Sequence, residues 1–473
     1  MNQKKVSFFM ISTLIIWSFI ILYFFLYERE SIKNEILTAI EDVNTPDTSN
    51  TINELIQIKD TDSIRDLYKS KEVLINEFPF VRNYLKDYPD LNWKEIEYDW
   101  LIIQNEIEKS GSNTQINFPF SEKGFRINRP IVVKQGQKLN FSPNTRLLDY
   151  TNDYAFKIEG GNEFPHNAIT HVSINNLDIV GGDNSQGAIL IKNAYLIELN
   201  NIKVSEYVNS ETKAISLQDF FQINFNSLQI NQIPNGVGLN IDSKEGNSGQ
   251  LNLMNTIIQR SNIGIKIEGS LNLIDGINMY GGAVGNNYST GVKIGKNVNN
   301  VNFIGSHFEN HDGNTYEGTV AIDMELDDNL SIESVNLIGN LFVNNKIGIV
   351  SNNTSRVNLT GNQFDGRGIE NSIAIKQGKG DRAWTISPNQ FINYDTNIIE
   401  NGNNHLNLSK ISIDGEGAIY PQNAKAGIYS GEGNPNGNVN AIAGSIYLRS
   451  DESESKLYLK TGNESNQGWE PLN

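Results

Sequence analysis

Residues 299–308, NNVNFIGSHF, are followed by two segments of the same design, ESVNLIGNLF at 333–342 and SRVNLTGNQF at 355–364. Each segment has apolar side chains at alternating positions, then a glycine, and a phenylalanine three residues after the glycine. Alternation with period two is typical of a β-strand that buries one face, and glycine favours a tight corner. These segments therefore predict short strands that recur along the chain and meet at the same corner.

The pattern extends over residues 170–400. The last apolar residue of each unit serves as its anchor, and successive anchors lie 21 to 34 residues apart. The nine anchors are Ile179, Val204, Ile230, Ile258, Met279, Phe308, Phe342, Phe364 and Phe391. An apolar residue stands five positions before each anchor, a bend residue stands three before it, and a further alternating strand opens most units. Three short strands per unit predict one turn of a parallel β-solenoid, since no unit buries its apolar face alone. The fold class is therefore all-β, with about nine coils; an antiparallel sandwich is the alternative.

Composition excludes several classes of function. The chain has 473 residues, a formal net charge of −17, no cysteine and five histidines. Phosphate backbones would be repelled by this charge, so nucleic acid is not an expected partner. Without cysteine there are no disulfides, thiolate metal sites or cysteine nucleophiles. We expect no cofactor and no resident metal site.

The N-terminus predicts the compartment. Residues 6–27 form an uncharged run of 22 residues, long enough to span a bilayer, and Lys4 and Lys5 precede it. Lysines before the run favour a cytoplasmic N-terminus and an exported C-terminal part. We predict a signal anchor at 1–30 and a helical stalk or linker at 31–91, which makes a single-pass cell-membrane protein with an extracellular body. A cleaved signal peptide and a buried core helix are the alternatives.

Residues 92–150 are predicted to form a helical cap followed by the first strands, ahead of the main β-helix at 151–410. Trp100, Ile103 and Ile107 lie on one helix face. The segment 99–119, DWLIIQNEIEKSGSNTQINFP, resembles the cap and first strand of pectate-lyase-like right-handed parallel β-helix proteins. That resemblance implies a right-handed, single-stranded β-helix, and solenoid enzymes of this kind usually act on polysaccharides.

The C-terminus has a different pattern. Residues 411–440 form a predicted glycine-rich linker, and 441–473 a β-hairpin module in which Trp469 covers an apolar face. The segments GEGNPNG at 431–437, AGSIYLRSD at 443–451 and GWEPL at 468–472 resemble terminal modules of phage tail-fibre and appendage proteins. That resemblance implies association with sugar-binding spikes. A plain terminal hairpin is the alternative.

Outward positions supply the candidate site. Asp323 and Glu325 flank an inward residue on one strand, about 7 Å apart, within the ~6.5–9.5 Å of an inverting carboxylate pair. They are the candidate catalytic residues. Lys293, one coil earlier, with His307 and Glu309 beside the longest insertion, are candidates for substrate binding. A ladder of exposed Asp and Lys side chains without catalysis is the alternative. Exposed amides are further candidates to bind sugar hydroxyls, namely Gln229, Asn302, Asn336 and Gln363.

The predicted function is that of a membrane-anchored extracellular β-helix protein that binds, and in one version cleaves, a polysaccharide. As an enzyme it would be a polysaccharide lyase or a glycoside hydrolase. The alternatives are a non-catalytic adhesive or structural surface protein and a tailspike-like spike, and a homotrimer is left open. An anionic glycan would meet a strongly negative chain, so a neutral glycan or a bridging Ca²⁺ fits better.

Overall fold

The computed structural model describes part of the chain, namely residues 80–82, 96–162, 164–311, 313, 319–326, 332–399, 406–407, 411–413, 419–421, 426–431, 433–450, 455–462 and 465–472. The signal anchor predicted at 1–30 lies outside these ranges. The stalk predicted at 31–91 lies outside them as well, except for a short helical stretch at 80–82. In the described ranges, no helix is both long and apolar enough to cross a bilayer.

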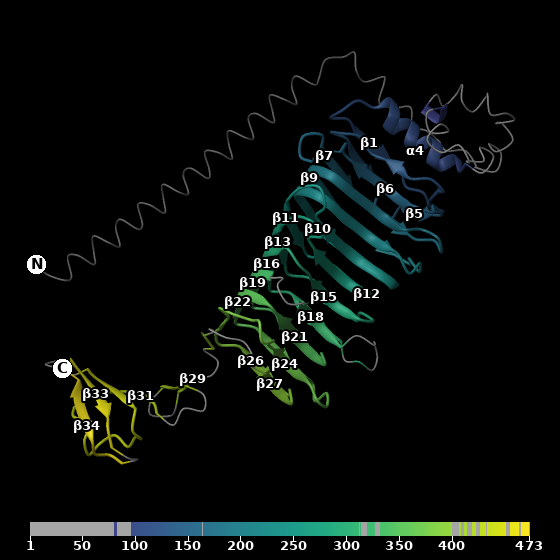
Figure 1. Ribbon diagram of the computed structural model, residues 1–473. Helices are drawn as coiled ribbons and strands as arrows, with labels where there is room; N and C mark the ends of the chain where they lie inside the picture. Colours follow the sequence, from purple (N-terminus) through teal and green to yellow (C-terminus); the bar gives the residue numbers. More distant parts are fainter. Residues whose placement is uncertain are drawn as a thin grey trace, which may run out of the picture. The chain divides into compact units, whose positions relative to one another are not determined.

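The strands stack into a parallel solenoid of about ten turns, built from three columns of strands (Figure 1). The first column contains β1 (Gln115–Phe118), β4 (Lys138–Phe141), β7 (Ile169–Asn175), β11 (Ser248–Met254), β13 (Ile274–Tyr280), β16 (Val298–Ile304), β19 (Ile332–Ile338), β22 (Thr354–Thr360), β25 (Thr385–Ile386) and β28 (Leu406–Asn407). The second contains β2 (Phe125–Ile127), β5 (Arg146–Asp149), β8 (Asp178–Val180), β14 (Ala283–Gly285), β17 (His307–Glu309), β20 (Leu341–Val343), β23 (Gln363–Asp365) and β26 (Gln390–Ile392). The third contains β3 (Ile131–Val132), β6 (Tyr154–Glu159), β15 (Thr290–Ile294), β18 (Val320–Glu325), β21 (Ile347–Asn352), β24 (Ile373–Lys376) and β27 (Thr396–Ile399).

Three long strands continue through the corners of the solenoid, and each therefore contributes to more than one column. They are β9 (Gly187–Ser205), β10 (Lys213–Asp242) and β12 (Ile257–Glu268). The pairings within the three columns are parallel, as between β16 and β19, β17 and β20, and β18 and β21. This confirms the predicted all-β parallel solenoid and excludes the antiparallel sandwich.

The core lies inside the three columns, because alternate side chains of each strand point inward. The expected inward residues Phe303, Leu337 and Leu359 are at most 1% exposed. Their counterparts in the second column, Phe308 and Phe342, are fully buried. Stacking of coils therefore supplies the apolar interior that a single coil lacks.

The corner between the first and second columns uses left-handed backbone, as predicted. Asn176 and Asn201 have φ values of 58° and 53°, and Gly305 has a φ of 65°. A Cβ added at Gly305 would meet open space, so the positive φ and not a lack of room favours glycine there. In the last unit the corner position is occupied by Pro388. Its ring fixes φ at a negative value, so this corner does not use left-handed backbone.

One unit was predicted in the wrong register. Met279 was expected as the anchor of the fifth unit, but it lies in the first column, where it pairs with Leu253 and Phe303. The anchor is Val284, which pairs with Ile258 and Phe308 in the second column. Both Gly276 and Gly281 have positive φ, so the sequence offers two corners five residues apart and only the second turns the chain.

The helix α4 (Tyr98–Lys109) covers the N-terminal end of the solenoid, as its apolar face predicted. Trp100, Ile103 and Ile107 are at most 1% exposed. The Gln104 amide donates to the carbonyl of Val132 and accepts the N–H of the same residue at 2.9 Å, so it completes the open edge of β3. Edge strands left open invite pairing with other chains, and α4 prevents this at the first coil.

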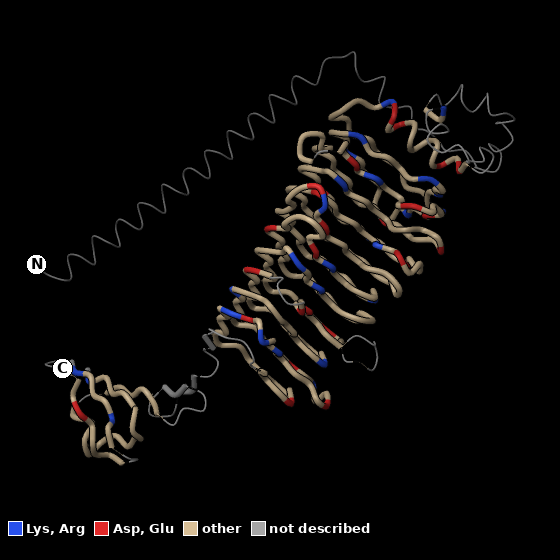
Figure 2. The backbone as a smooth tube through the Cα atoms, in the orientation of Figure 1, with Lys and Arg blue, Asp and Glu red and all other residues tan. Residues whose placement is uncertain are grey.

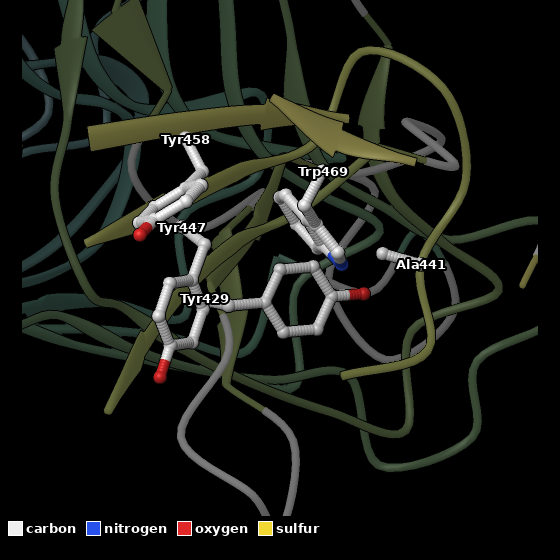
Figure 3. Close-up of a cluster of buried hydrophobic side chains, with 5 residues drawn as sticks. All are labelled: Tyr429, Ala441, Tyr447, Tyr458 and Trp469. Carbon is white, nitrogen blue, oxygen red and sulfur yellow. The ribbon is translucent and has the colours of Figure 1, made fainter. Parts of the chain in front are cut away.

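The C-terminal residues form a separate sheet, in the order β29 (Ile411–Ile413), β30 (Ile419–Pro421), β31 (Ile428–Gly431), β32 (Ile446–Ser450), β33 (Ser455–Lys460) and β34 (Trp469–Leu472). β32 and β33 form the predicted antiparallel hairpin. β31, from the segment expected as a linker, pairs in parallel with β32. Figure 3 shows the core of this sheet, which consists of Tyr429, Ala441, Tyr447, Tyr458 and Trp469.

Candidate functional site

The predicted carboxylate pair lies on the outer side of the third column. Asp323 and Glu325 are both on β18, and Lys293 is the register partner of Asp323 on β15. The Lys293 Nζ is 3.9 Å from Asp323 Oδ2. Lys376 Nζ on β24 is 4.0 Å from Glu325 Oε1. Each carboxylate is thus paired with a lysine of another coil.

The Asp323 carboxylate also turns back onto its own strand, where Oδ1 accepts the N–H of Glu325 at 3.0 Å. The Asp323 carboxylate is therefore held in place by a backbone N–H of its own strand and by the lysine of the preceding coil. Figure 2 shows the same mixture over the solenoid, with basic and acidic positions interspersed along the strands. The carboxylates therefore belong to a surface on which charges of both signs alternate.

The structure does not bring the five predicted site residues together. His307 and Glu309 are on β17 in the second column, where they pair with Leu341 and Val343 of β20. Asp323 and Glu325 are in the third column, which is a different face of the solenoid. The longest insertion, between Glu309 and Val320, lies largely outside the described residues.

A histidine of the same stretch is buried instead of facing a ligand. His311 is 0% exposed, and its Nδ1 is 2.8 Å from Asn345 Oδ1. Its Nε2 is 3.3 Å from Asn287 Nδ2. An amide oxygen only accepts and an amide nitrogen only donates, so His311 is held as the neutral tautomer with the proton on Nδ1. The side chain is part of an internal polar ladder at the corner between the second and third columns.

An open pocket of about 550 Å³ lies elsewhere, over coils near the N-terminal end of the solenoid. It is lined by Phe164, Pro165, Ala168, Thr170, Tyr195, Phe221, Gly246 and Asn247. The rings of Tyr195 and Phe221 are neighbours on successive coils, with centroids 5.7 Å apart and an interplanar angle of 30°. Both rings are half-buried outward residues of the first column. Sequence reasoning missed this pocket, although aromatic residues at outward positions of two neighbouring units were a readable signal.

Loops from two distant segments complete the pocket. Phe164 precedes β7, and Gly246 precedes β11. A Cβ added at Gly246 would lie 3.1 Å from Cδ1 of Phe164, so glycine lets the ring approach closely. Thr170 and Asn247 supply polar groups to an otherwise apolar wall. Apolar walls with a few polar groups are typical of sites for small ligands.

Two further pockets lie at the corner between the second and third columns and are mainly polar. One, of about 530 Å³, includes Tyr154, Glu211 and Lys213. Burial lowers the pKa of Lys213, and it raises the pKa of Tyr154 to about 12. The other, of about 590 Å³, includes Lys346 and Arg367. Neither pocket includes a residue of the predicted site.

Among the described residues, the carboxyl group with the most strongly shifted pKa lies inside the solenoid. Burial raises the pKa of Asp149 to about 6, although hydrogen bonds from Thr151, Tyr207 and Ser185 oppose this shift. The Tyr207 hydroxyl donates to Asp149 Oδ2 at 3.0 Å, and Tyr207 is itself fully buried. With no access to solvent for a substrate, this group concerns stability and not binding.

A bridging Ca²⁺ would need several oxygen ligands in one place. Across the part of the chain that the structure describes, no group of three or more His, Asp or Glu side chains is arranged to hold a metal ion. The bridging ion therefore stays a prediction.

No family model matches the chain. No curated protein matches its sequence either. Among solved structures it is similar to the A-module of the mannuronan C-5 epimerase AlgE4 of Azotobacter vinelandii, with 11% identity, 65% of this chain and 94% of that one covered, and a TM-score of 0.43. It is also similar to PfbA, a surface adhesin of Streptococcus pneumoniae, with 12% identity, coverage of 78% and 93%, and a TM-score of 0.46. A third is the DFA-IIIase of Arthrobacter chlorophenolicus A6, with 10% identity, coverage of 65% and 89%, and a TM-score of 0.49. Likeness at this level carries no information about what this chain binds.

Proposed function

We propose that the chain is a surface-anchored extracellular β-helix protein that binds a polysaccharide without cleaving it. The pocket lined by Tyr195, Phe221 and Phe164 is the observation that carries this proposal. A sugar ring has an apolar face of C–H groups and a rim of hydroxyls. Aromatic rings in an open pocket suit the apolar face, and Thr170 and Asn247 suit the hydroxyls.

The ion pairs that Asp323 and Glu325 form favour binding over cleavage. Acid–base cleavage needs one carboxyl held protonated and another free to act, within reach of one bond. Asp323 and Glu325 are instead each paired with a lysine, and His307 lies on another face. Cleavage at this pair is the second candidate function, since both carboxylates still share one outer strand face.

Anchoring in the membrane is part of the proposal and rests on the uncharged run at 6–27. The segment at 31–91 would hold the solenoid away from the bilayer. Protease added to intact cells should remove the solenoid and leave a short membrane-bound stub. Full protection of residues 31–473 would show the opposite orientation, and release of the whole chain without a stub would show a cleaved signal.

The binding proposal is tested with the full-length chain in detergent on an array of cell-wall and capsular glycans. Tyr195→Ala and Phe221→Ala should each weaken retention on the bound glycan by roughly tenfold or more, about 1.4 kcal/mol. The control is Phe120→Ala, because Phe120 is an aromatic residue that is 59% exposed and does not line the pocket. Equal retention by all variants would remove the pocket as the binding site.

A further inference from the structure

We infer that the outer face of the first column carries a track for a neutral, extended polysaccharide that runs from the aromatic pocket along the solenoid. This inference rests on the proposed function and adds the class of glycan and its direction. The track consists of two parallel rows. The amide row is Asn224, Asn252, Asn278, Asn302 and Asn336, and the apolar row is Met254, Tyr280, Ile304 and Ile338.

The amide row is a continuous ladder. Its five asparagines are register partners on β10, β11, β13, β16 and β19. From Asn252 onward, each Nδ2 donates to the Oδ1 of the asparagine on the preceding coil, with distances of 2.9, 3.1, 2.8 and 2.8 Å. The ladder fixes the rotamer of each amide, so the row is pre-organised before any ligand arrives.

The ladder leaves hydrogen-bonding capacity on its outer side. An asparagine has two donor hydrogens and an oxygen with two acceptor positions, and one ladder bond uses one of each. Asn224 is exposed and the other four amides are half-buried. A hydroxyl both donates and accepts, so sugar hydroxyls match these remaining positions.

The apolar row lies two residues further along the same strands. Met254 and Tyr280 are 48% and 42% exposed, while Ile304 and Ile338 are half-buried. These four residues are also register partners on successive coils. The strands β11, β13, β16 and β19 therefore each present an amide and an apolar side chain about 7 Å apart, which matches the hydroxyl edge and the apolar face of a sugar ring.

The track continues from the pocket. Phe221 of the pocket and Asn224 of the amide row both project outward from β10. On the next coil the register partner of Phe221 is Gly249, which has no side chain to block the path. Successive coils lie about 4.8 Å apart, and the rise per unit of a β-1,4-linked pyranose chain is close to this spacing. One sugar unit can thus lie over each coil.

The negative charge beside the amide row favours a neutral ligand over an anionic one. The row on the other side of the amides contains Asp275 and Glu333, which are joined in register through Asn299. Glu333 is paired with Arg356, and Asp275 accepts from Asn300. An anionic chain would meet these acids and a net charge of −17 without a basic row to offset them.

The test measures how affinity depends on glycan length. The probes are neutral β-1,4 oligosaccharides of glucose, xylose, mannose and N-acetylglucosamine, two to eight units long, with a hexagalacturonate as the anionic probe. For at least one neutral series, affinity of the full-length chain should rise with each unit up to about six and then level off. Hexagalacturonate should bind at least tenfold more weakly than the matching neutral hexamer.

A double variant, Asn278→Thr with Asn302→Thr, interrupts the ladder. It should keep the fold, because the same row continues through Asn358 to a natural threonine, Thr385, on a later coil. It should lower affinity for the hexamer at least tenfold and leave disaccharide binding in the pocket unchanged. Asn140→Thr is the matched control. Asn140 is also a middle member of an amide ladder, between Asn117 and Asn175, but no apolar row accompanies it.

The outcomes separate the track from the pocket. Length-independent affinity, or an unchanged hexamer affinity in the double variant, overturns the track while the pocket stands. Tighter binding of hexagalacturonate overturns the neutral class. If no oligosaccharide binds, or if Tyr195→Ala and Phe221→Ala change nothing, both the proposed function and the track are wrong.

Discussion

Phe342 stacks on Phe364 of the next coil, with ring centroids 4.5 Å apart and an interplanar angle of 9°. The stack continues to Phe308 at 4.9 Å and to Phe391 at 5.2 Å. Four coils are thus joined through one file of rings in the second column. A ring in the middle of this file has neighbours above and below and no access to water.

Truncation of Phe342 should be strongly destabilising. Phe342→Ala removes both stacking contacts and leaves a cavity, so the free energy of unfolding should fall by about 3–5 kcal/mol. Gln363→Ala, at the outward position beside Phe364, should change it by less than about 0.5 kcal/mol. Urea unfolding followed by circular dichroism measures both, and similar losses from the two variants would contradict the inward–outward assignment.

The repeat was predictable because its physical causes are local. Alternation of inward and outward residues needs only period two, and asparagine or glycine at the corner needs only a positive φ. The fifth unit shows the limit of this reasoning. Gly276 and Gly281 both have left-handed backbone, and Ile274, Ile277 and Met279 are all buried. Only pairing with the neighbouring coils decides that Val284 is the anchor.

The candidate site was less predictable than the fold, because it depends on which residues far apart in the sequence lie on the same face of the solenoid. Asp323 and Lys293 are joined as the register implied, but His307 belongs to another face. The pocket needs Phe164 and Gly246 to come together from loops far apart in sequence. The amide row was readable in outline, since Asn302 and Asn336 were expected at outward positions, whereas its continuity required the register of every coil.

The internal ladder at His311 gives a prediction about buried hydrogen bonds. His311→Ala would leave the amide of Asn287 and the oxygen of Asn345 without this partner in a dry environment. Loss of a buried partner costs about 1–3 kcal/mol, so the melting temperature should fall by several degrees. His311→Asn should restore part of the stability, because a second amide can again accept on one side and donate on the other. If the alanine and asparagine variants are equally unstable, the loss comes from volume and not from the hydrogen bonds.

Asp149 gives a prediction about pH. Its pKa is about 6 in the folded chain and 3.8 in the unfolded chain, so between these values the folded state binds more protons. Stability from this group is fully present below pH 3.8 and is lost as the pH rises through about 6. The difference in pKa corresponds to about 3 kcal/mol. The gap in unfolding free energy between wild type and Asp149→Asn should therefore shift in favour of the variant by about this amount between pH 3.8 and 7.

Tyr207→Phe serves as an internal check on the pH prediction. The Tyr207 hydroxyl donates to Asp149 and lowers its pKa, so its removal should move the loss of stability to higher pH. A gap between wild type and Asp149→Asn that does not change with pH would show that Asp149 has the same pKa in the folded and the unfolded chain.

Substitutions at Asp323 and Glu325 distinguish a binding protein from an enzyme. Their ion pairs with Lys293 and Lys376 lie at the surface, so Asp323→Asn and Glu325→Gln should each change the free energy of unfolding by less than about 1 kcal/mol. We expect the wild-type chain to release neither reducing ends nor unsaturated products from the glycan that it binds. We also expect both variants to retain that glycan as wild type does, since the pocket and the track lie on the first column. Product release by wild type that either substitution abolishes, without a change in melting temperature, would instead identify Asp323 and Glu325 as the catalytic pair of an enzyme.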